Sequence, residues 1–289
     1  MSETYVLLNG RLTKQSEAFI SINDSGFLYG FGCYDTLLAL NYKPLFLEEH
    51  IKRLNDSLRE LRILESGFDT DKLSEKIIEL LSINNHNNAR IRLTVTKGNI
   101  DLNKIHIEDP NMTQLITSTK LPDDYYNRDI KPFKLYISKY IRNHPNSVPP
   151  SLKLTSLANH LFASMEAKEK GFDDGIMINH EGHLTEGTSF NIFFIKNNIA
   201  YTPHLKTGIL PGITRSILIN LLKDNNINFE EGYYKKESLY TADEAFVTSS
   251  VRGIVPIIQV DQHVISLGKL TETIISYYFQ YLKLLSTNG

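Results

Sequence analysis

Two residues in the second half of the sequence, a lysine and a glutamate, have the type and setting that could support chemistry. Lys153 follows Pro149-Pro150 at the start of a predicted helix, where a positive charge is unfavourable beside the helix dipole. A lysine that is partly removed from water can form a Schiff base with a carbonyl compound. Taken singly, Lys153 is also typical of a solvated loop lysine, and Glu186, in a bend rich in glycine and hydroxyl groups, is typical of a turn residue.

Two short segments of the same half could hold a phosphate group. In Leu210–Arg215 a proline and a glycine precede an apolar-periodic helix, so the amides around Ile213 and the hydroxyl of Thr214 could face an anion. The second segment carries the hydroxyls of Ser249 and Ser250 after a predicted strand. Each segment is also typical of an ordinary helix start or turn. The sequence alone leaves open whether the two segments meet.

An arginine in the first half is a further candidate. Arg53 lies on the flank of a predicted helix and shares a face with His50 and Ser57, away from the leucine stripe of that helix. Arginines on the surface of helices usually only contact solvent. On its own, Arg53 therefore gives no evidence of a functional site.

The elements that must position Arg53 form a predicted α/β domain over residues 1–119. Asn9-Gly10 between two apolar stretches is a hairpin signal. Apolar residues spaced by four and three from Leu47 to Leu61 predict an amphipathic helix that packs on the early sheet. The other elements expected in this domain are a helix over 71–82 and strands over 90–96 and 112–118.

The lysine and the glutamate belong to a second predicted domain, 151–289. Five prolines between 120 and 150 surround one possible strand, 133–138, and mark a connection between the domains. The second domain is expected to contain helices over 154–170 (ended by Gly171), after Pro211 and over 267–285, a hairpin through 175–195, and strands near 244–248 and 254–260. Strand meanders and helices occur in both halves, which favours an α+β fold over a doubly wound sheet.

The composition excludes several classes of protein. Lys plus Arg is 31 and Asp plus Glu is 33 in 289 residues, a formal charge of −2, without the basic excess of a general nucleic-acid binder. The longest apolar runs are far shorter than the ~20 residues that span a bilayer. Cys33, the sole cysteine, cannot form an internal disulfide and is typical of a packed apolar residue. With no signal-peptide pattern at the start, a cytoplasmic protein is expected.

Taken together, these pieces resemble a known family, the class IV aminotransferases, which are the fold-type IV pyridoxal-phosphate enzymes. The resemblance runs from about residue 5 to residue 260. The motifs that carry it are Asp24-Ser-Gly26, Tyr29–Thr36, His50–Leu54, Lys153, Asn159, Glu166-Ala167, Gly171–Asp174, Leu184–Gly187, Asn191–Phe193, Thr202-Pro203 and Ile209–Arg215.

The resemblance implies a two-domain, α+β architecture like that of D-amino-acid aminotransferases, with pyridoxal 5'-phosphate as cofactor and no metal. It implies that Lys153 carries the cofactor and shuttles a proton, and that Glu186 pairs with the pyridine nitrogen. It further implies a homodimer whose partner chain completes the substrate pocket. The residues that the resemblance assigns to the cofactor phosphate are Arg53, Ile213, Thr214, Ser249 and Ser250.

The sequence departs from the family pattern at three places that bear on the substrate pocket. Phe31 stands where an acidic residue is usual, Asp35 replaces a glutamate, and Ser156 interrupts the run after the lysine. The arginine-containing loop of D-amino-acid aminotransferases has no evident match in 98–104, which makes that specificity less expected. The candidates for binding a substrate carboxylate are Tyr34, Arg92 and Arg252, for each of which an ion pair or a packing role is an equally good interpretation.

The leading hypothesis is transfer of an amino group from a small, branched-chain L-amino acid to a 2-oxo acid such as 2-oxoglutarate. One alternative is 4-amino-4-deoxychorismate lyase, which eliminates pyruvate to give 4-aminobenzoate, because Arg142-Asn143, Ser147 and Gly26–Gly30 resemble that subgroup. A second alternative is a non-enzymatic binding protein that keeps the fold, supported only by the three departures.

Overall fold

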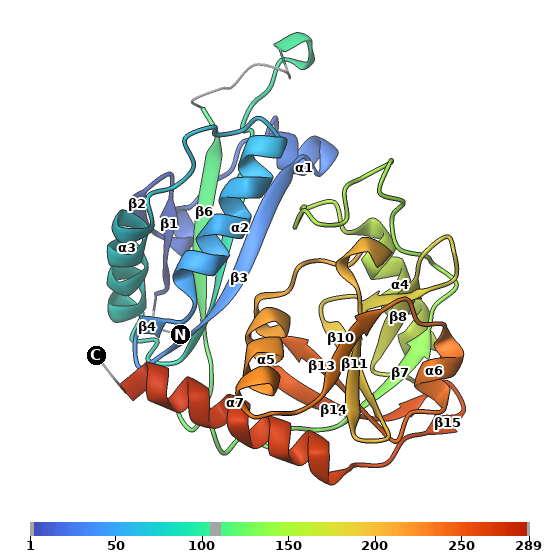
Figure 1. The fold of residues 1–289 in the computed structure, drawn as a ribbon. Coiled ribbons are helices and arrows are strands. Elements are labelled where there is room, and N and C mark those ends of the chain that lie inside the picture. Colours follow the sequence, from blue (N-terminus) through green and yellow to red (C-terminus); the bar gives the residue numbers. More distant parts are fainter. Residues whose placement is uncertain (1–2, 105–110, 288–289) are drawn as a thin grey trace. The chain divides into compact units, whose positions relative to one another are not determined.

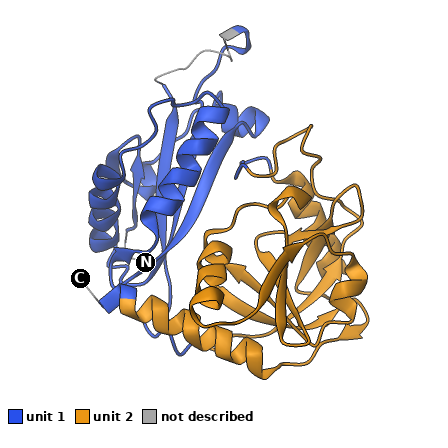
Figure 2. Ribbon diagram, in the orientation of Figure 1, with its two compact units in different colours: residues 1–128, 152–156, 285–289 blue, residues 129–151, 157–284 orange. Residues whose placement is uncertain are grey.

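Residues 3–104 and 111–287 are described by the computed structural model, and the chain divides into two units (Figure 2). Unit 1 comprises residues 1–128, 152–156 and 285–289, and unit 2 comprises 129–151 and 157–284. The first division, after residue 128, falls inside the predicted connection 120–150. The segment 152–156, expected to open the second domain, belongs instead to unit 1.

Unit 1 is built on an antiparallel sheet (Figure 1), whose described strands are six, in the order β2-β1-β6-β5-β3-β4. The predicted hairpin is confirmed: Asn9 and Gly10, with φ of 50° and 74°, have the left-handed backbone of a two-residue turn. The strands are β1 Tyr5–Leu8, β2 Arg11–Lys14, β3 Gly32–Leu40, β4 Lys43–Pro44, β5 Ala89–Thr96 and β6 Thr113–Lys120.

Helices cover one face of this sheet. The leucine stripe of α2, including Leu54 and Leu58, packs with Ile77 of α3 onto alternate strand residues such as Ile91 and Leu93. Because strand side chains alternate between faces, the residues between them, including those of the predicted substrate set, lie on the face opposite α2 and α3. The helices of unit 1 are η1 Gln15–Glu17, α1 Ser25–Tyr29, α2 Leu47–Glu60, α3 Thr70–Ile83 and η2 Leu102–Lys104.

Unit 2 contains a mixed sheet of nine described strands. Its order is β12-β11-β10-β13-β14-β7-β8-β9, with β15 paired to β14. The pairs β11/β12, β14/β7 and β7/β8 are parallel and the other pairs are antiparallel, which confirms the α+β class. The strands are β7 Phe133–Ile137, β8 Asp174–Ile178, β9 Leu184–Gly187, β10 Asn191–Lys196, β11 Ile199–Pro203, β12 Phe229–Gly232, β13 Glu244–Ser249, β14 Gly253–Val260 and β15 His263–Val264.

The three longest helices of unit 2 were expected from the sequence, one of them with an earlier start, whereas its short helices 205–207 and 236–240 were not expected. The last helix, α7, reaches into residues 285–287, which are grouped with unit 1. Within residues 3–104 and 111–287, no helix is long and apolar enough to cross a membrane. The helices are α4 Ala158–Glu169, η3 Leu205–Thr207, α5 Ile213–Asp224, α6 Lys236–Tyr240 and α7 Lys269–Thr287.

The helix predicted to begin at Leu154 begins at Ala158, so the prediction that Lys153 opens a helix is wrong. The backbone groups of this segment are used elsewhere: Leu154 forms an antiparallel bridge with Cys33 of β3. The amide of Thr155 donates to the carbonyl of Gly32 at 2.9 Å. Groups bonded to a neighbouring strand cannot also make the first turn of a helix.

Candidate active site

Lys153 is held in unit 1 by pairing of its own backbone with β3. Its carbonyl accepts a hydrogen bond of 2.9 Å from the amide of Tyr34. On the far side of Leu154, the hydroxyl of Thr155 donates to the carbonyl of Gly30 at 2.7 Å and of Gly32 at 3.1 Å. The helix dipole therefore does not explain this lysine. Its position follows from a short strand-like segment that extends the sheet edge of β3.

The side chain of Lys153 lies beside two of the predicted substrate residues. Its Nζ is 4.8 Å from the centroid of the Tyr34 ring, and the guanidinium carbon of Arg92 is 3.8 Å from the same centroid. Within the described residues, no carboxylate pairs with Lys153 or with Arg92. Unit 1 thus brings the amine, the aromatic ring and one arginine together.

Arg53 lies on the other face of the sheet's third strand, in an ion pair with Asp35. Its Nε and Nη2 donate to the two carboxylate oxygens at 2.9 and 2.8 Å, and Nδ1 of His50 is 2.8 Å from Oδ1. Burial alone would raise the pKa of Asp35, but the charges of Arg53 and His50 outweigh it and lower the pKa. Asp35, which stands where the family pattern has a glutamate, is therefore the buried carboxylate that orients Arg53.

His50, in the same cluster, is buried next to two cations. Burial lowers the pKa of His50, and the charges of Arg53 and Lys153 lower it further against the opposing influence of Asp35. A neutral imidazole that donates from Nδ1 to the carboxylate satisfies this geometry. Cys33, on the same face of β3, is also buried, and burial raises the pKa of its thiol to about 12.

Glu186 in unit 2 is a buried carboxylate with several donors. Its Oε1 is 2.9 Å from Nη2 of Arg142. Its Oε2 accepts hydrogen bonds from Nδ2 of Asn191 at 3.1 Å and from the amide of Leu210 at 3.0 Å. Arg142 and Asn191 were not among the predicted site residues. A polar residue at the start of the otherwise apolar strand β10 was a signal for Asn191, whereas no spacing in the sequence links Arg142 to Glu186.

Arg142 extends this network to a histidine. Its Nη1 is 2.9 Å from Nε2 of His160, and Nδ1 of His160 is 2.8 Å from Oδ1 of Asn159. A guanidinium can only donate, so Nε2 accepts and the ring carries its proton on Nδ1. Arg142 also donates to the backbone carbonyls of Gly208 and Pro150. The arginine is therefore fixed on several sides.

The predicted phosphate segments meet around Asn191. A Cβ on Gly212 would lie 1.8 Å from Oδ1 of Asn191, so only glycine permits this approach of the α5 start to β10. Asn191 and Thr248 are cross-strand partners and their side chains share a face. The hydroxyl of Thr248 is buried and has no partner among the described residues. Thr214 is buried in the first turn of α5, which has no side-chain cap.

These features of unit 2 fit the cofactor that the resemblance implies. A phosphate needs donors, and the uncapped start of the 12-residue helix α5 and the unpartnered Thr248 hydroxyl supply them. A protonated pyridine nitrogen needs a carboxylate, and Glu186 is a buried carboxylate of this unit. Ser249 and Ser250 follow Thr248 at the end of β13. Among the described residues, no group of three His, Cys, Asp or Glu side chains could hold a metal ion.

The remaining predicted residue, Arg252, lies in the turn after β13 in unit 2. It is exposed, and its guanidinium carbon is 5.5 Å from the ring centroid of Phe133. Lys153, Tyr34, Arg92 and Arg53 belong to unit 1, whereas the Glu186 group and Arg252 belong to unit 2.

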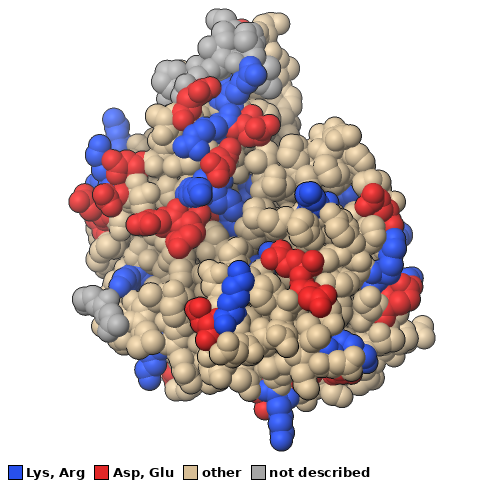
Figure 3. Space-filling model, in the orientation of Figure 1, with Lys and Arg blue, Asp and Glu red and all other residues tan. Residues whose placement is uncertain are grey.

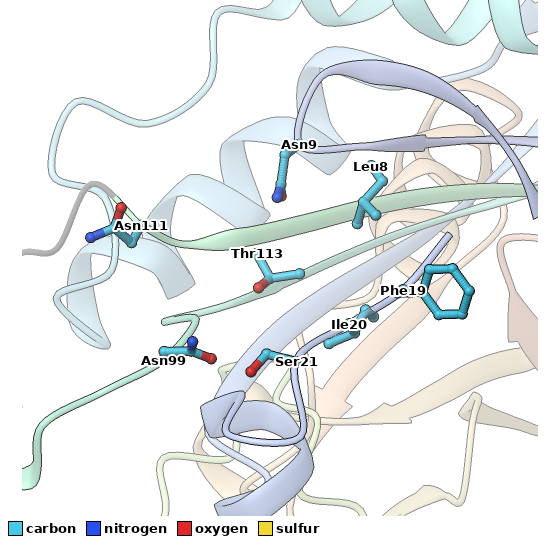
Figure 4. Close-up of a pocket in the computed structure, with 8 residues that line it drawn as sticks. All are labelled: Leu8, Asn9, Phe19, Ile20, Ser21, Asn99, Asn111 and Thr113. Carbon is cyan, nitrogen blue, oxygen red and sulfur yellow. The ribbon is translucent and has the colours of Figure 1, made fainter. Parts of the chain in front are cut away.

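Unit 1 also has a hollow of about 340 Å³ that none of the predicted site residues lines. Figure 4 shows that Phe19, Ile20 and Ser21 border it together with side chains at the ends of strands. Its lining residues are Leu8, Asn9, Phe19, Ile20, Ser21, Asn99, Asn111 and Thr113.

Acidic and basic side chains are interspersed on the face of the molecule in Figure 3, with no large area of a single sign. The cationic candidates for the site, such as Lys153 and Arg53, are therefore single side chains and not part of a large basic surface on this face.

Comparisons with known proteins agree on one family. The family model described as amino-transferase class IV matches residues 32–260. A Methanocaldococcus jannaschii protein with the provisional name branched-chain-amino-acid aminotransferase is 32% identical over 271 residues, 92% of each chain. Aminodeoxychorismate lyase of Bacillus subtilis is 31% identical over 264 residues, 89% of this chain and 87% of that protein.

A solved structure covers nearly the whole chain. The branched-chain aminotransferase of Thermoproteus uzoniensis, crystallised with norvaline, superimposes with a TM-score of 0.89 at 28% identity. The match covers 99% of this chain and 97% of that one.

Proposed function

The chain belongs to the class IV aminotransferases, and on that basis we propose that it transfers an amino group between a small, branched-chain L-amino acid and a 2-oxo acid such as 2-oxoglutarate. The enzymes of this family use pyridoxal 5'-phosphate, which supplies an electron sink for a deprotonated α-carbon when it is bound. The observation that carries the proposal is the amine of Lys153, fixed by its backbone to β3 and beside Tyr34 and Arg92.

The proposed roles follow from the contacts of each residue. Nζ of Lys153 holds the cofactor and, as a free amine, carries the proton of the substrate α-carbon. Glu186, oriented by Arg142 and Asn191, pairs with the pyridine nitrogen and keeps it protonated. Arg92 receives a substrate carboxylate next to the ring of Tyr34.

The phosphate group is proposed to lie at the start of α5. The amide of Ile213, the hydroxyl of Thr214 and the hydroxyls of Ser249 and Ser250 are the donors on unit 2. Arg53 adds a cation, with its guanidinium oriented by Asp35. Arg252 is a further candidate for a substrate carboxylate.

We also propose a homodimer in the cytoplasm. Phe19, Ile22 and Phe27 are 80, 77 and 74% exposed in the single chain, and such a run of exposed apolar residues is typical of an interface. Because the proposal is a homodimer, we expect a second copy of this chain to cover these apolar residues. The cytoplasm is proposed because the one cysteine of the chain, Cys33, provides no internal disulfide.

Two assays on the purified protein test the proposed reaction. We expect glutamate from leucine and 2-oxoglutarate, and no pyruvate from aminodeoxychorismate. Pyruvate formation alone would establish the lyase instead, the alternative to which the 31% identity to the Bacillus subtilis enzyme belongs.

Two variants control these assays. Lys153→Ala should abolish amino transfer, while Lys269→Ala, on the exposed start of α7, should leave it unchanged. Borohydride should bleach a yellow protein and leave the label on Lys153. A colourless protein that cannot be reconstituted with pyridoxal phosphate would contradict both enzymatic readings and leave the non-enzymatic binding protein.

A further inference from the structure

Arg215, in the first turn of α5, is a buried cation to which the proposed reaction assigns no role. It closes the motif Ile209–Arg215, and its side chain is 3% exposed. A positive charge is unfavourable at the start of a helix, where the free backbone amides already carry partial positive charge. Burial of the charge adds a desolvation penalty. An arginine in this position therefore needs either compensating partners or a function.

The contacts of Arg215 lead to two neighbouring strands of unit 2. Its Nη2 donates to the carbonyl of Pro203 in β11 at 2.9 Å and to Oε2 of Glu231 in β12 at 2.8 Å. The two strands are parallel partners in the sheet. The guanidinium therefore ties the first turn of α5 to both strands.

The start of α5 is also held at β10, the next strand of the same sheet. Gly212 lies so close to Asn191 that no larger side chain would fit. Gly212 precedes and Arg215 follows the two residues Ile213 and Thr214, which carry the proposed phosphate donors. Donors stabilise an anion best when their direction is fixed before the anion binds. The two anchors hold this turn in one orientation.

The charge of Arg215 is only partly compensated. Its Nε is buried and has no hydrogen-bond acceptor among the residues that the structure describes. Glu231, whose side chain is 30% exposed, is screened by solvent and offsets the buried charge incompletely. The first turn of α5 therefore has a net positive potential, which favours an anion at its free amides.

We propose that Arg215 is a positioning residue for the phosphate group of the cofactor. It fixes the first turn of α5 on β11 and β12, and its charge adds to the positive potential at the amides of that turn. Arg215 itself donates to Pro203 and Glu231, so it acts on the phosphate through Ile213 and Thr214. The inference rests on the phosphate site of the proposed function.

Binding of two ligands to the full chain tests this role. Pyridoxal 5'-phosphate and pyridoxal differ only in the phosphate group, so a residue that acts on the phosphate affects the first ligand alone. We expect the natural protein to bind pyridoxal 5'-phosphate more tightly than pyridoxal. Arg215→Met, which removes the charge and keeps an unbranched side chain, should weaken pyridoxal 5'-phosphate about 10-fold and leave pyridoxal within about twofold. Arg215→Lys should recover part of the lost affinity, since it restores the charge without the planar fork.

Lys196→Met is the matched control, because Lys196 also joins a carboxylate and a backbone carbonyl in unit 2. Its Nζ is 2.9 Å from Oδ1 of Asp243 and 2.5 Å from the carbonyl oxygen of Thr241. It lies at the end of β10 opposite to Asn191. Lys196→Met should change neither affinity.

Two results would overturn the role of Arg215. These are an equal weakening of both ligands in Arg215→Met and no weakening of either. Circular dichroism checks the fold of this variant, in which the partly exposed Glu231 can be solvated. If Arg215→Met does not fold, Arg215→Lys decides: a loss confined to pyridoxal 5'-phosphate supports the role, and an equal loss of both ligands contradicts it.

Amino-transfer kinetics separate this inference from the proposed function. In Arg215→Met, saturating pyridoxal 5'-phosphate should restore kcat for leucine to within about twofold of the natural value. If the protein transfers no amino group but Arg215→Met weakens only the phosphorylated ligand, the positioning role stands and the proposed reaction fails. If amino transfer proceeds and Arg215→Met weakens both ligands equally, the proposed function stands and the positioning role fails.

Discussion

At the residue scale, both oxygens of Glu186 are oriented by donors from separate elements. Arg142 precedes α4, Asn191 starts β10, and Leu210 precedes α5. A buried carboxylate held in this way keeps one orientation without rearranging when a cationic ring nitrogen arrives. The role that we propose for Arg142 is a positioning one, because it contacts Glu186, the proposed partner of the cofactor.

Replacement of Arg142 should therefore affect both stability and activity. Arg142→Gln leaves Glu186 buried without its charge partner, so we expect a loss of about 3 kcal/mol in the free energy of unfolding. Amino transfer should fall at least 10-fold, with a changed absorbance maximum of the bound cofactor. Arg59→Gln, which breaks an ion pair whose side chains are 50 and 57% exposed, is the control and should cost less than about 1 kcal/mol. Natural absorbance and activity in Arg142→Gln would contradict the assigned role.

The buried thiol gives a second prediction at this scale. Because burial raises the pKa of Cys33 to about 12, the reactive thiolate is scarce at neutral pH. We expect no reaction with a thiol reagent in the folded protein and one equivalent after denaturation in guanidinium. Rapid labelling of the folded protein would show that β3 opens in solution.

The sequence indicated the residues proposed to carry the chemistry but not the residues that contact and orient them in the structure. Lys153 and Glu186 were identified through their motif context. Arg142 and Asn191 act through contacts between elements far apart in the chain, which spacing does not encode.

At the scale of elements, the segment 152–156 decides where the amine lies. It pairs with β3, and Thr155 anchors it with two side-chain hydrogen bonds to carbonyls of residues 30 and 32. The apolar pattern after Lys153 predicted a helix four residues too early, because Leu154 is apolar on account of the unit 1 core it packs against. Tertiary pairing overrode the local signal there, whereas the long periodic helices α2 and α3 were predicted closely.

Removal of the Thr155 hydroxyl tests this anchor. Thr155→Val keeps the shape and loses both hydrogen bonds, so we expect amino transfer to fall about 10-fold through misplacement of Lys153. Thr273→Val is the matched control, since its hydroxyl also donates to a backbone carbonyl, that of Lys269 on the exposed side of α7. An equal effect of both substitutions on activity would contradict a positioning role for Thr155.

The cluster beneath β3 predicts how stability depends on pH. The pKa of His50 is lowered in the folded state, so the unfolded chain takes up the proton first as the pH falls below about 6.5. The contribution of neutral His50 to the free energy of unfolding is fully present above that pH. It is lost as the pH falls further, by up to about 1.4 kcal/mol per pH unit.

Thermal unfolding from pH 7.5 to pH 5 measures this dependence. The Tm of the natural protein should fall with pH, and His50→Asn, which keeps a donor toward Asp35, should show a smaller fall. His263→Asn, on the exposed strand β15, should retain the natural dependence. The same slope in His50→Asn as in the natural protein would contradict the assignment.

At the scale of the whole molecule, the exposed apolar residues of unit 1 predict self-association. Phe27→Asp combined with Phe19→Asp should shift the mass in sedimentation from dimer to monomer, because each places a charge in a desolvated interface. Val264→Asp, at an apolar residue of unit 2 that is 83% exposed, should leave the dimer intact. A natural protein that sediments as a monomer and retains full activity would contradict the dimer.

The chain crosses between the two units several times, so the protein cannot be divided into its units by one cut. Unit 1 is completed by residues 152–156 and 285–287, which follow most of unit 2 or are embedded in it. A fragment that ends at residue 128 would lack the segment that lies beside β3, and a fragment that begins at 129 would carry Lys153 without its strand partner. No single cut in the polypeptide therefore yields a half that keeps the Lys153 amine beside β3, so we expect the proposed reaction to require the intact chain.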